Sequence, residues 1–318
     1  MRPGTEVSAA APDETEIAGD SRLGGGLGLL VRIAEWIGVE SALCCGEALG
    51  AAWWALRGPR RARVREQIAR AFPERDPAWV DATARGVFLH LGLGLAEGLL
   101  LAGRHRGALL ERAEVEGLEH LRAACDLAGD RGVLLASAHL GNWELAGAKL
   151  AEMGLPVAAV YRDPGRPALE QALLRIRGPA VAAIPMGPRA GVQFLRALEG
   201  GRTVLALLDQ RARREESVFV TFFSREAATR VAPIKLAARA GVPIVCGWAQ
   251  RGPDRRCHRL TIQPALQPAR SDSDDDKVVQ RVLQQVTAEL EQAIRATPEQ
   301  WIWTHRRWRT PRDANDET

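Results

Sequence analysis

The pattern of apolar and polar positions changes near residue 115. Before that point, apolar residues recur at the spacing of a helix face, as in Trp79, Val80, Thr83, Val87, Phe88, Leu91 and Leu95, and this periodicity predicts helices. Pro73 and Pro77 separate two of them, because proline interrupts a helical pattern. Residues 23–113 are therefore predicted to form a helical N-terminal region.

Beyond residue 115, short apolar runs of strand length alternate with helical patterns. The runs are Val133–Ala138, Val157–Tyr161, Thr203–Leu208, Pro243–Trp248 and Arg259–Ile262. The helical patterns are Trp143–Met153, Ala168–Arg175, Ala190–Glu199, Ala232–Ala240 and a last stripe from Val279 to Ile294. This alternation predicts an α/β fold with a mixed, largely parallel central sheet flanked by helices.

The sequence divides into four parts on this basis. We expect a disordered acidic tail at 1–22, the helical region at 23–113, an α/β domain at 114–311 and a short tail at 312–318. The acidity of the first 22 residues argues against a signal peptide. A polar linker is expected at 268–276, before the last helix.

No segment is expected to cross a membrane as a classical spanning helix, which needs about 20 mostly apolar residues. Glu40 and Glu47 interrupt the apolar stretch 36–56, and Glu97 interrupts the stretch 86–103. The first stretch ends in Trp53, Trp54 and a run of arginines, a composition typical of helices that lie in the membrane interface. We favour such a membrane-associating region; the alternative is a core helix followed by a solvated basic turn.

Composition and net charge limit the classes of binding partner that the sequence predicts. The chain is 46% hydrophobic and 26% charged, as folded globular proteins are. Its net charge of +4 suits a phospholipid surface or an acidic carrier protein better than nucleic acid. The five cysteines are scattered and form no C-x-x-C pair, which favours reduced thiols and gives no reason to expect a metal site.

The strongest candidate for chemistry lies where the predicted strand Val133–Ala138 ends. His139 follows directly, Gly141 allows a tight turn, Asn142 can cap the next helix, and Glu144 falls in its first turn. Catalytic groups gather at the carboxyl ends of strands in open α/β sheets. A histidine that takes a proton from a hydroxyl needs an acceptor on its other ring nitrogen, and Glu144 could supply it. The alternative is a buried histidine satisfied by a backbone carbonyl.

Other polar residues follow two further predicted strands. Asp209 falls on the same sheet edge as His139 and is interpreted as a second carboxylate on the imidazole, a holder of an arginine, or a cap. Arg162 can offer charge to an oxyanion or a phosphate, or form a surface ion pair with Asp163 or Glu170. Further candidate phosphate ligands, with a solvated loop as the alternative, are Arg189, Arg211, Arg213 and Arg214.

The stretch from His139 to Glu144 resembles the catalytic motif of the lipid A biosynthesis acyltransferases, the lauroyl/myristoyl transferase branch of the lysophospholipid acyltransferase superfamily. Further blocks that resemble this family follow its order: Arg70–Glu74, Val160–Arg162, Leu207–Gln210 with Val218–Phe223 and Ala228-Thr229, and Trp301–Arg309. The resemblance covers about residues 23–311. It implies a mixed sheet wrapped by helices, with an N-terminal helical membrane anchor.

The resemblance also implies a reaction and the cellular location in which it occurs. A fatty acyl chain would pass from an acyl carrier protein thioester to a hydroxyl of a lipid A precursor or related glycolipid, without a cofactor, at the cytoplasmic face of the inner membrane. By motif, His139 would be the general base, Glu144 its orienting carboxylate, and Arg162 and Asp209 part of the site. The remaining candidate substrate-binding residues are Asn142, Arg189 and Arg211. An acyl thioesterase and a non-catalytic membrane-peripheral lipid-binding protein stay open as alternatives.

Overall fold

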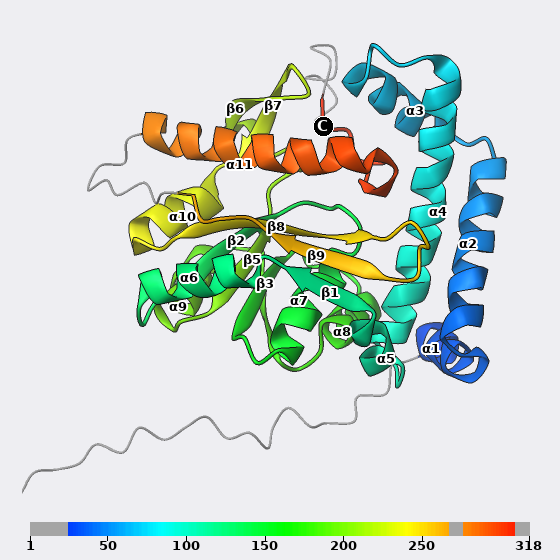
Figure 1. Ribbon diagram of the computed structural model, residues 1–318, viewed down its shortest axis with the longest axis horizontal. Coiled ribbons are helices and arrows are strands. Elements are labelled where there is room, and N and C mark those ends of the chain that lie inside the picture. The colour runs from blue at the N-terminus through cyan, green and yellow to red at the C-terminus, as the bar shows by residue number, and fades with distance from the viewer. Residues whose placement is uncertain (1–24, 267–275, 309–318) are drawn as a thin grey trace, which may run out of the picture.

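A seven-stranded sheet lies at the centre of the computed structural model, which describes residues 25–266 and 276–308 (Figure 1). Its strand order is β1-β9-β8-β2-β5-β3-β4. The strands are β1 (Ala113–Glu116), β2 (Val133–Ser137), β3 (Val157–Tyr161), β4 (Val181–Pro185), β5 (Thr203–Leu207), β8 (Ile244–Arg251) and β9 (His258–Ile262). The five strands from β8 to β4 are parallel, whereas β9 is antiparallel to β8. The predicted mixed, largely parallel sheet is confirmed.

Apolar clusters on the two faces of this sheet explain why its central strands appear as continuous apolar runs. Alternate residues of a strand point to opposite faces. In β2, Leu134 and Ala136 belong to one buried cluster, and Val133 and Leu135 belong to the other. Both faces are therefore core, and a polar side chain can reach solvent only beyond the strand end.

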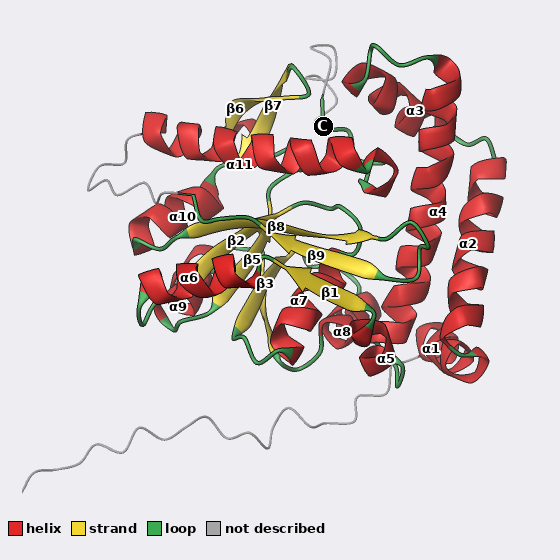
Figure 2. Ribbon diagram, in the orientation of Figure 1, coloured by secondary structure: helices red, strands yellow, loops and turns green. Residues whose placement is uncertain are grey.

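Helices cover both faces (Figure 2). Side chains of α6 (Leu118–Ala128) and α7 (Trp143–Glu152) pack against one face, and those of α9 (Ala190–Glu199), α10 (Ala232–Ala240) and α11 (Asp276–Ala296) pack against the other. The remaining short elements of this half are α8 (Pro167–Arg177) and the 3-10 turns η1 (Arg214–Glu216) and η2 (Pro298–Gln300). Helices α7 to α11 match the predicted patterns to within a few residues, whereas no pattern predicted α6.

The N-terminal region is helical, as predicted. It contains α1 (Gly25–Ile37), α2 (Val39–Ala55), α3 (Pro59–Ala71), α4 (Pro77–Leu101) and α5 (Arg106–Glu111). Helices α2 and α4 run side by side (Figure 1), and glycines allow their backbones to approach closely. A Cβ atom at Gly92 would lie 2.1 Å from the carbonyl oxygen of Gly46, and one at Gly50 would lie 2.3 Å from that of Phe88. Small residues four apart serve the same purpose in membrane helices.

Helix α4 differs from the expectation about spanning segments. Within residues 25–266 and 276–308 it is the one helix long and apolar enough to cross a membrane by length and composition. Glu97, which was expected to interrupt the apolar stretch, does not lower the mean hydropathy of α4 enough to exclude a membrane span on these criteria. Half of its most apolar window is nevertheless buried inside the protein, which is also the packing of a core helix.

Besides α6, two edge strands and a hairpin were not predicted. Strands β1 and β4 lie at the two edges of the sheet. Strand β1 has four residues, of which two are glutamates, and β4 is a five-residue apolar run that ends in a proline. The hairpin of β6 (Ser217–Phe222) and β7 (Arg225–Arg230) turns at Phe223 and Ser224, whose φ angles are 52° and 57°. Glycine or asparagine normally marks such a turn, so the sequence carried no signal. The expected tails and nearly all of the linker at 268–276 lie outside the described residues.

Gly92→Ala should destabilise the protein because the added methyl group meets the backbone of α2. Its cost is about 1–3 kcal/mol, typical of overpacking. Gly94→Ala is the matched control, because its Cβ would contact only the Arg251 guanidinium, at 3.7 Å. Since alanine favours a helix over glycine by about 0.5–1 kcal/mol, the control should be neutral or stabilising. Equal urea midpoints for the two variants would contradict close packing of α2 on α4.

Candidate active site

The register between β2 and β5 places His139 beside Asp209. Ser137 lies opposite Leu207, so residues two positions further on meet at the carboxyl edge of the sheet. His139 Nδ1 lies 2.9 Å from Asp209 Oδ1, and the backbone N–H of His139 donates to Oδ2, also at 2.9 Å. An ionised carboxylate only accepts hydrogen bonds. Nδ1 therefore carries the proton, and Nε2 is left as the basic nitrogen of the ring.

The Asp209 side chain has no exposed surface, whereas that of His139 is 20% exposed. Burial opposes the charge of Asp209, but the His139 ring, the Trp301 indole and the His139 backbone N–H outweigh it and hold the pKa of Asp209 below its ordinary value. Trp301 Nε1 donates to Oδ2 at 2.6 Å. The carboxylate thus stays charged at neutral pH and can stabilise a positive charge on the imidazole.

Glu144 does not make the contact that the sequence assigned to it. Its carboxylate accepts two hydrogen bonds from Arg177 at the end of α8, Nε to Oε2 at 2.7 Å and Nη2 to Oε1 at 2.9 Å. Asp209 orients the imidazole instead. The physical reason is topological: Asp209 comes from the strand next to β2, whereas Glu144 lies on the first turn of α7 and packs toward α8.

A polar cavity of about 300 Å³ opens in front of the His139 ring. Four arginines line it, namely Arg162, Arg177, Arg211 and Arg230. Arg162 is exposed and forms no hydrogen bond or ion pair within the described part of the chain, so the alternative of an ion pair with Asp163 or Glu170 does not hold. The carboxylate of Glu170 instead accepts from the Tyr161 hydroxyl at 2.7 Å.

The other candidate arginines lie elsewhere. Arg189 occupies the N-cap position of α9, and Arg213 and Arg214 lie at η1; the lining of the polar cavity contains none of the three. Arg177, which the sequence analysis did not single out, is the arginine that binds Glu144. A basic residue at the end of a helix gives no sign of its partner in the sequence alone.

A second cavity, of about 320 Å³, is almost wholly apolar. One face of α4 forms its long wall through Val87, Leu91, Leu95, Gly98 and Leu101. The opposite wall includes Trp53, Ile176, Trp301 and Ile302.

The two cavities share Trp143 and Glu144 as lining residues. The Trp143 ring meets the His139 ring edge-on, with centroids 4.9 Å apart. His139 therefore lies where a charged compartment adjoins an apolar one.

Asn142 is buried and its side chain is already engaged, although it was predicted to bind substrate. Its Oδ1 accepts from the Leu145 N–H at 3.0 Å, which caps α7, and its Nδ2 donates to Glu97 at 2.8 Å. Asn142 borders the apolar cavity, but its polar atoms hold the turn after His139 in place. It is a structural residue of the site in this arrangement.

Glu97 is the centre of a buried charge network on the other side of that turn. Arg251 binds it through Nε at 2.9 Å and through Nη2, and His258 Nε2 lies 3.1 Å away. Burial raises the pKa of Glu97, but the charges of Arg251 and His258 outweigh burial and lower it. His90 accepts from Arg251 at 3.0 Å, and burial together with Arg251 lowers the pKa of His90 to about 3. His90 is therefore neutral at physiological pH.

An α/β protein with a histidine–carboxylate pair at the carboxyl edge of its sheet has the architecture of a hydrolase or a group-transfer enzyme. The family profile of the bacterial lipid A biosynthesis acyltransferases matches residues 25–310, and the chain belongs to this family. No group of three or more histidine, cysteine, aspartate or glutamate side chains suited to a metal ion occurs in the described ranges.

The individual proteins that this chain resembles are also acyltransferases by name. The lipid A biosynthesis lauroyltransferase of Escherichia coli K12 is 30% identical over 254 residues, which cover 79% of this chain and 80% of that protein. The palmitoleoyltransferase of the same strain is 26% identical over 280 residues, 86% and 88% of the two chains. A phosphatidylinositol mannoside acyltransferase of Mycobacterium tuberculosis H37Rv is 28% identical over 200 residues, 61% and 59% of the two chains. Membership of the family supports acyl transfer to lipid A or a related glycolipid.

Glu97→Gln should lower the free energy of unfolding by about 3–5 kcal/mol, because it leaves the Arg251 charge buried without a counter-charge. The double variant Glu97→Leu, Arg251→Met should be much closer to wild type, since replacing a whole buried pair by apolar residues is often neutral. Urea unfolding of the wild type, Glu97→Leu, Arg251→Met and the double variant measures the coupling. Additive effects would contradict the network.

The Glu97–Arg251 pair should make the stability of the folded protein fall as the pH falls. The pKa of Glu97 is lowered in the folded state, so its contribution to stability is present above its ordinary value of 4.5 and is lost as the pH falls below it. Between pH 5 and about pH 3, the wild type should lose stability faster than the double variant. Asp209 is unchanged in both proteins, so its own titration cancels in the difference.

Proposed function

We propose that the protein transfers a fatty acyl chain from an acyl carrier protein thioester to a hydroxyl of a lipid A precursor or related glycolipid. The observation that carries this proposal is the position of His139, which is bound to a buried carboxylate at the junction of an arginine-lined cavity and an apolar cavity. A phosphorylated glycolipid and a fatty acyl chain need these two environments side by side.

In the proposed mechanism, His139 Nε2 removes the proton of the acceptor hydroxyl as its oxygen attacks the thioester carbon. The carbonyl oxygen becomes an oxyanion and the imidazole becomes an imidazolium, which Asp209 stabilises through Nδ1–H. The intermediate then collapses: the carbon–sulfur bond breaks, and the departing thiolate takes the proton from His139. The ester is formed and the histidine returns to its neutral state.

The arginines of the polar cavity would bind the negative charges of the acceptor and of the oxyanion. Arg162 is best suited, because its guanidinium has no carboxylate partner among the described residues and an arginine binds phosphate with two parallel hydrogen bonds. Arg211 lines the same cavity. Glu144 would act through Arg177, whose position it fixes, rather than on the imidazole.

The apolar cavity would hold the acyl chain. Its α4 wall lacks side chains at Gly94 and Gly98, which keeps the cavity open along the helix. Trp143 would separate the chain from the polar compartment and leave the thioester carbon near His139. Sites for apolar ligands are typically lined in this way, with a few polar groups at one end.

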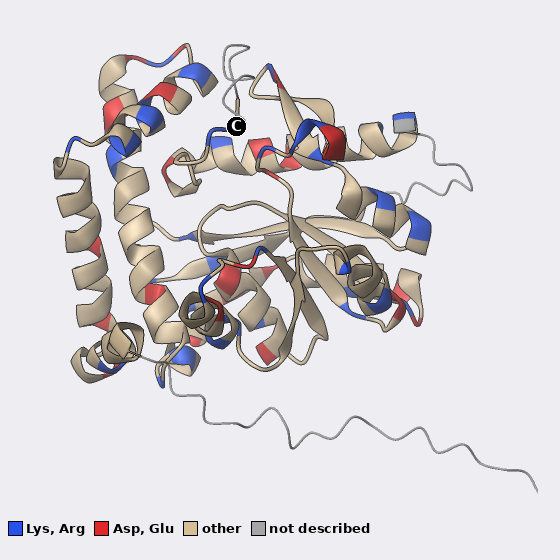
Figure 3. Ribbon diagram, turned by 180° about the vertical axis from the view of Figure 1, so that it is seen from behind, with Lys and Arg blue, Asp and Glu red and all other residues tan. Residues whose placement is uncertain are grey.

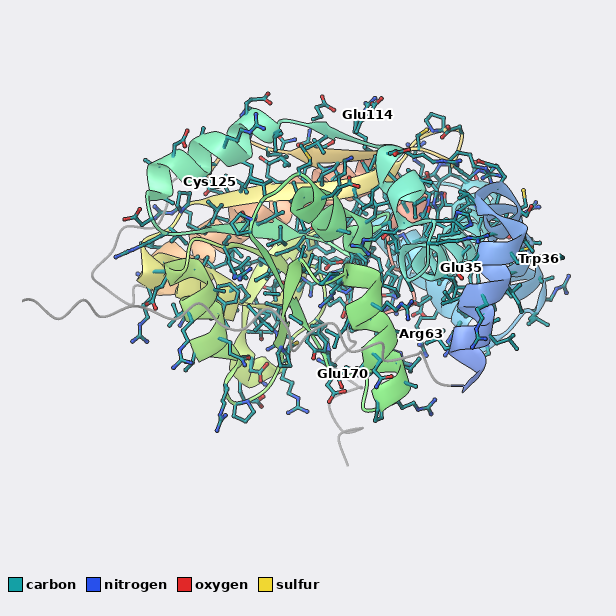
Figure 4. The ribbon with its side chains drawn as sticks, turned by 90° about the horizontal axis from the view of Figure 1, so that it is seen from below. Glu35, Trp36, Arg63, Glu114, Cys125 and Glu170 are labelled. Atoms are coloured by element: carbon teal, nitrogen blue, oxygen red, sulfur yellow. The ribbon has the colours of Figure 1, made fainter. Side chains whose placement is uncertain are left out.

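The membrane surface would be reached through the N-terminal helices. On α1, Leu29, Ile33 and Trp36 are exposed, Trp36 to 84%, and Trp36 points away from the body of the protein (Figure 4). Leu56, the residue that follows α2, is 75% exposed. Few charges interrupt α2 and α4, whereas basic positions gather on α3 (Figure 3). This combination fits attachment to anionic lipid, which we place at the cytoplasmic face of the inner membrane.

His139→Gln and Asp209→Asn should each abolish most acyl transfer while leaving the protein folded. Loss of a general base costs about 10²–10⁴ in rate, and loss of the orienting carboxylate about 10⁴. His120→Gln, on α6 and away from both cavities, is the matched control and should retain full activity. The assay offers long-chain acyl carrier protein with a lipid A precursor, a mannosylated lipid or a lysophospholipid.

The same assay separates the alternatives. Thiol release without an acylated product would indicate a thioesterase, and lipid binding that is unaffected by His139→Gln, with no reaction, would indicate a binding protein. Because the carrier protein is acidic, salt should raise the donor KM. A donor KM that is independent of salt would favour acyl-coenzyme A as the donor.

Gly98→Leu should shorten the acyl chain that the protein accepts. The first added carbon would contact Ile176 at 3.4 Å, so the side chain fits only by extending into the apolar cavity. Each methylene that no longer fits should cost about fourfold in kcat/KM, from about 0.8 kcal/mol per buried methylene. Gly107→Leu, at an exposed glycine of α5 with open space around it, is the control. An unchanged chain-length profile in Gly98→Leu would place the acyl chain elsewhere.

A further inference from the structure

The segment 301–308 takes no part in the proton transfer proposed above, yet it reaches the buried carboxylate. Trp301 is 2% exposed, and its indole N–H donates to Asp209 Oδ2 at 2.6 Å. The same oxygen accepts the backbone N–H of His139, while Oδ1 accepts the ring N–H. The carboxylate therefore has three donors, and Trp301 is the one that does not belong to His139.

Two aromatic rings and the backbone of its own segment hold the Trp301 ring in position. It meets the rings of Trp303 and Phe222 edge-on, with centroids at 4.5 Å and 5.7 Å. Its backbone forms a β-bridge with Leu140, and the next residue, Ile302, donates its N–H to the His139 carbonyl at 3.2 Å. The backbone of the C-terminal segment therefore pairs with the chain at His139 and at Leu140, directly after β2.

Two further contacts anchor this segment to distant elements. Gln67 of α3 donates to the Trp303 carbonyl at 2.6 Å and accepts the Arg307 N–H at 2.8 Å. Arg307 donates to the Ala228 carbonyl of β7 at 2.7 Å. The indole of Trp301 is held by packing and backbone contacts that do not depend on Asp209.

A comparison with Trp303 shows that burial of an indole does not require a carboxylate. Trp303 is fully buried in the same segment, and its N–H donates to the Pro298 carbonyl, also at 2.6 Å. A neutral acceptor is enough to satisfy an indole. The bond of Trp301 to a charged acceptor is stronger, and it acts on the group that orients His139.

We propose that Trp301 is a positioning residue of the His139–Asp209 pair, which it serves by fixing the plane of the Asp209 carboxylate and drawing charge away from Oδ1. The kinetic part of this inference rests on the proposed function; the structural part does not. Without the indole donor, more negative charge would face the His139 ring and favour its protonated form. The carboxylate would also lose the contact that prevents it from rotating.

Other titratable or charged groups surround the pair, and Trp301→Phe and Trp303→Phe leave all of them in place. Within the described residues, those on adjoining elements are His305 and Arg307 of the C-terminal segment and, around the polar cavity, Glu144, Arg162, Arg177, Arg211 and Arg230. A change that follows removal of the Trp301 N–H alone is therefore assigned to Asp209.

The experiment compares Trp301→Phe with Trp303→Phe. Both keep an aromatic ring and lose one buried indole donor, but only the first removes a hydrogen bond to Asp209. The titration of His139 is followed by NMR on protein labelled with ¹³C at histidine Cε1, with the signal assigned by its absence in His139→Gln. In Trp301→Phe its midpoint should rise by about half a pH unit or more, because the carboxylate loses a donor on Oδ2 and more of its negative charge then faces the ring. In Trp303→Phe it should stay at the wild-type value.

Kinetics provide the second readout. Trp301→Phe should lower kcat about tenfold, that is by about 1.4 kcal/mol, and move the acid limb of the kcat/KM profile upward by the same amount as the NMR midpoint. Because Trp301 also borders the apolar cavity, the donor KM is reported separately. A change in that KM alone, with an unmoved NMR midpoint, would overturn the positioning role and leave only a packing role.

The two proposals can fail independently. If the wild type transfers no acyl group but the NMR midpoint rises in Trp301→Phe alone, the proposed function fails and the positioning role stands. If Trp301→Phe does not fold, ¹⁵N-tryptophan spectra of the wild type decide: the Trp301 indole signal should titrate with the His139 midpoint, and the Trp303 signal should not. If the chemical shift of the Trp301 indole does not change with pH at the His139 midpoint, the inference is overturned.

Discussion

A buried negative charge at the carboxyl edge of the sheet constrains the rest of the site. Asp209 has no contact with solvent, so its charge persists only because donors are held against both oxygens. These donors come from the end of β2 and from the segment that ends the described chain. The register of β2 on β5, the turn after His139 and the path of the C-terminal segment must all be correct before the charge is tolerated.

A second buried carboxylate, Glu97, holds the other end of the same turn. It binds Asn142, three residues after His139, and is itself paired with Arg251 of β8. The turn from His139 to Asn142 is thus tied at both ends by acids that come from different layers of the fold. This arrangement also explains why α4, apolar enough to cross a membrane, contains a buried charge: Glu97 fixes the wall of the apolar cavity to the turn after His139.

Much of this architecture follows from local pattern. The central strands are buried on both faces, so their apolar runs stand out, and the position of His139 after such a run indicates the correct edge of the sheet. The choice between Asp209 and Glu144 as partner of the imidazole depends on strand register, which no local pattern specifies. The hairpin turn at Phe223 and Ser224 could not be predicted from the sequence for a different reason. Its left-handed backbone is accompanied by burial of Phe223 and by a bond from its N–H to Glu291, and both arise only in the folded protein.

Three carboxylates balance the positive charges around the polar cavity, and each of them has its own partner. Four arginines line this cavity, and together they would oppose a positive charge on the imidazole. Glu144 and Glu216 neutralise two of them, Arg177 and Arg230. Asp209 is in direct contact with the ring, and an interaction at 2.9 Å in a buried setting outweighs more distant and more exposed charges. Positive potential therefore remains in the cavity beside an imidazole whose positive charge Asp209 can stabilise, and the acid of the sequence motif binds an arginine rather than the histidine.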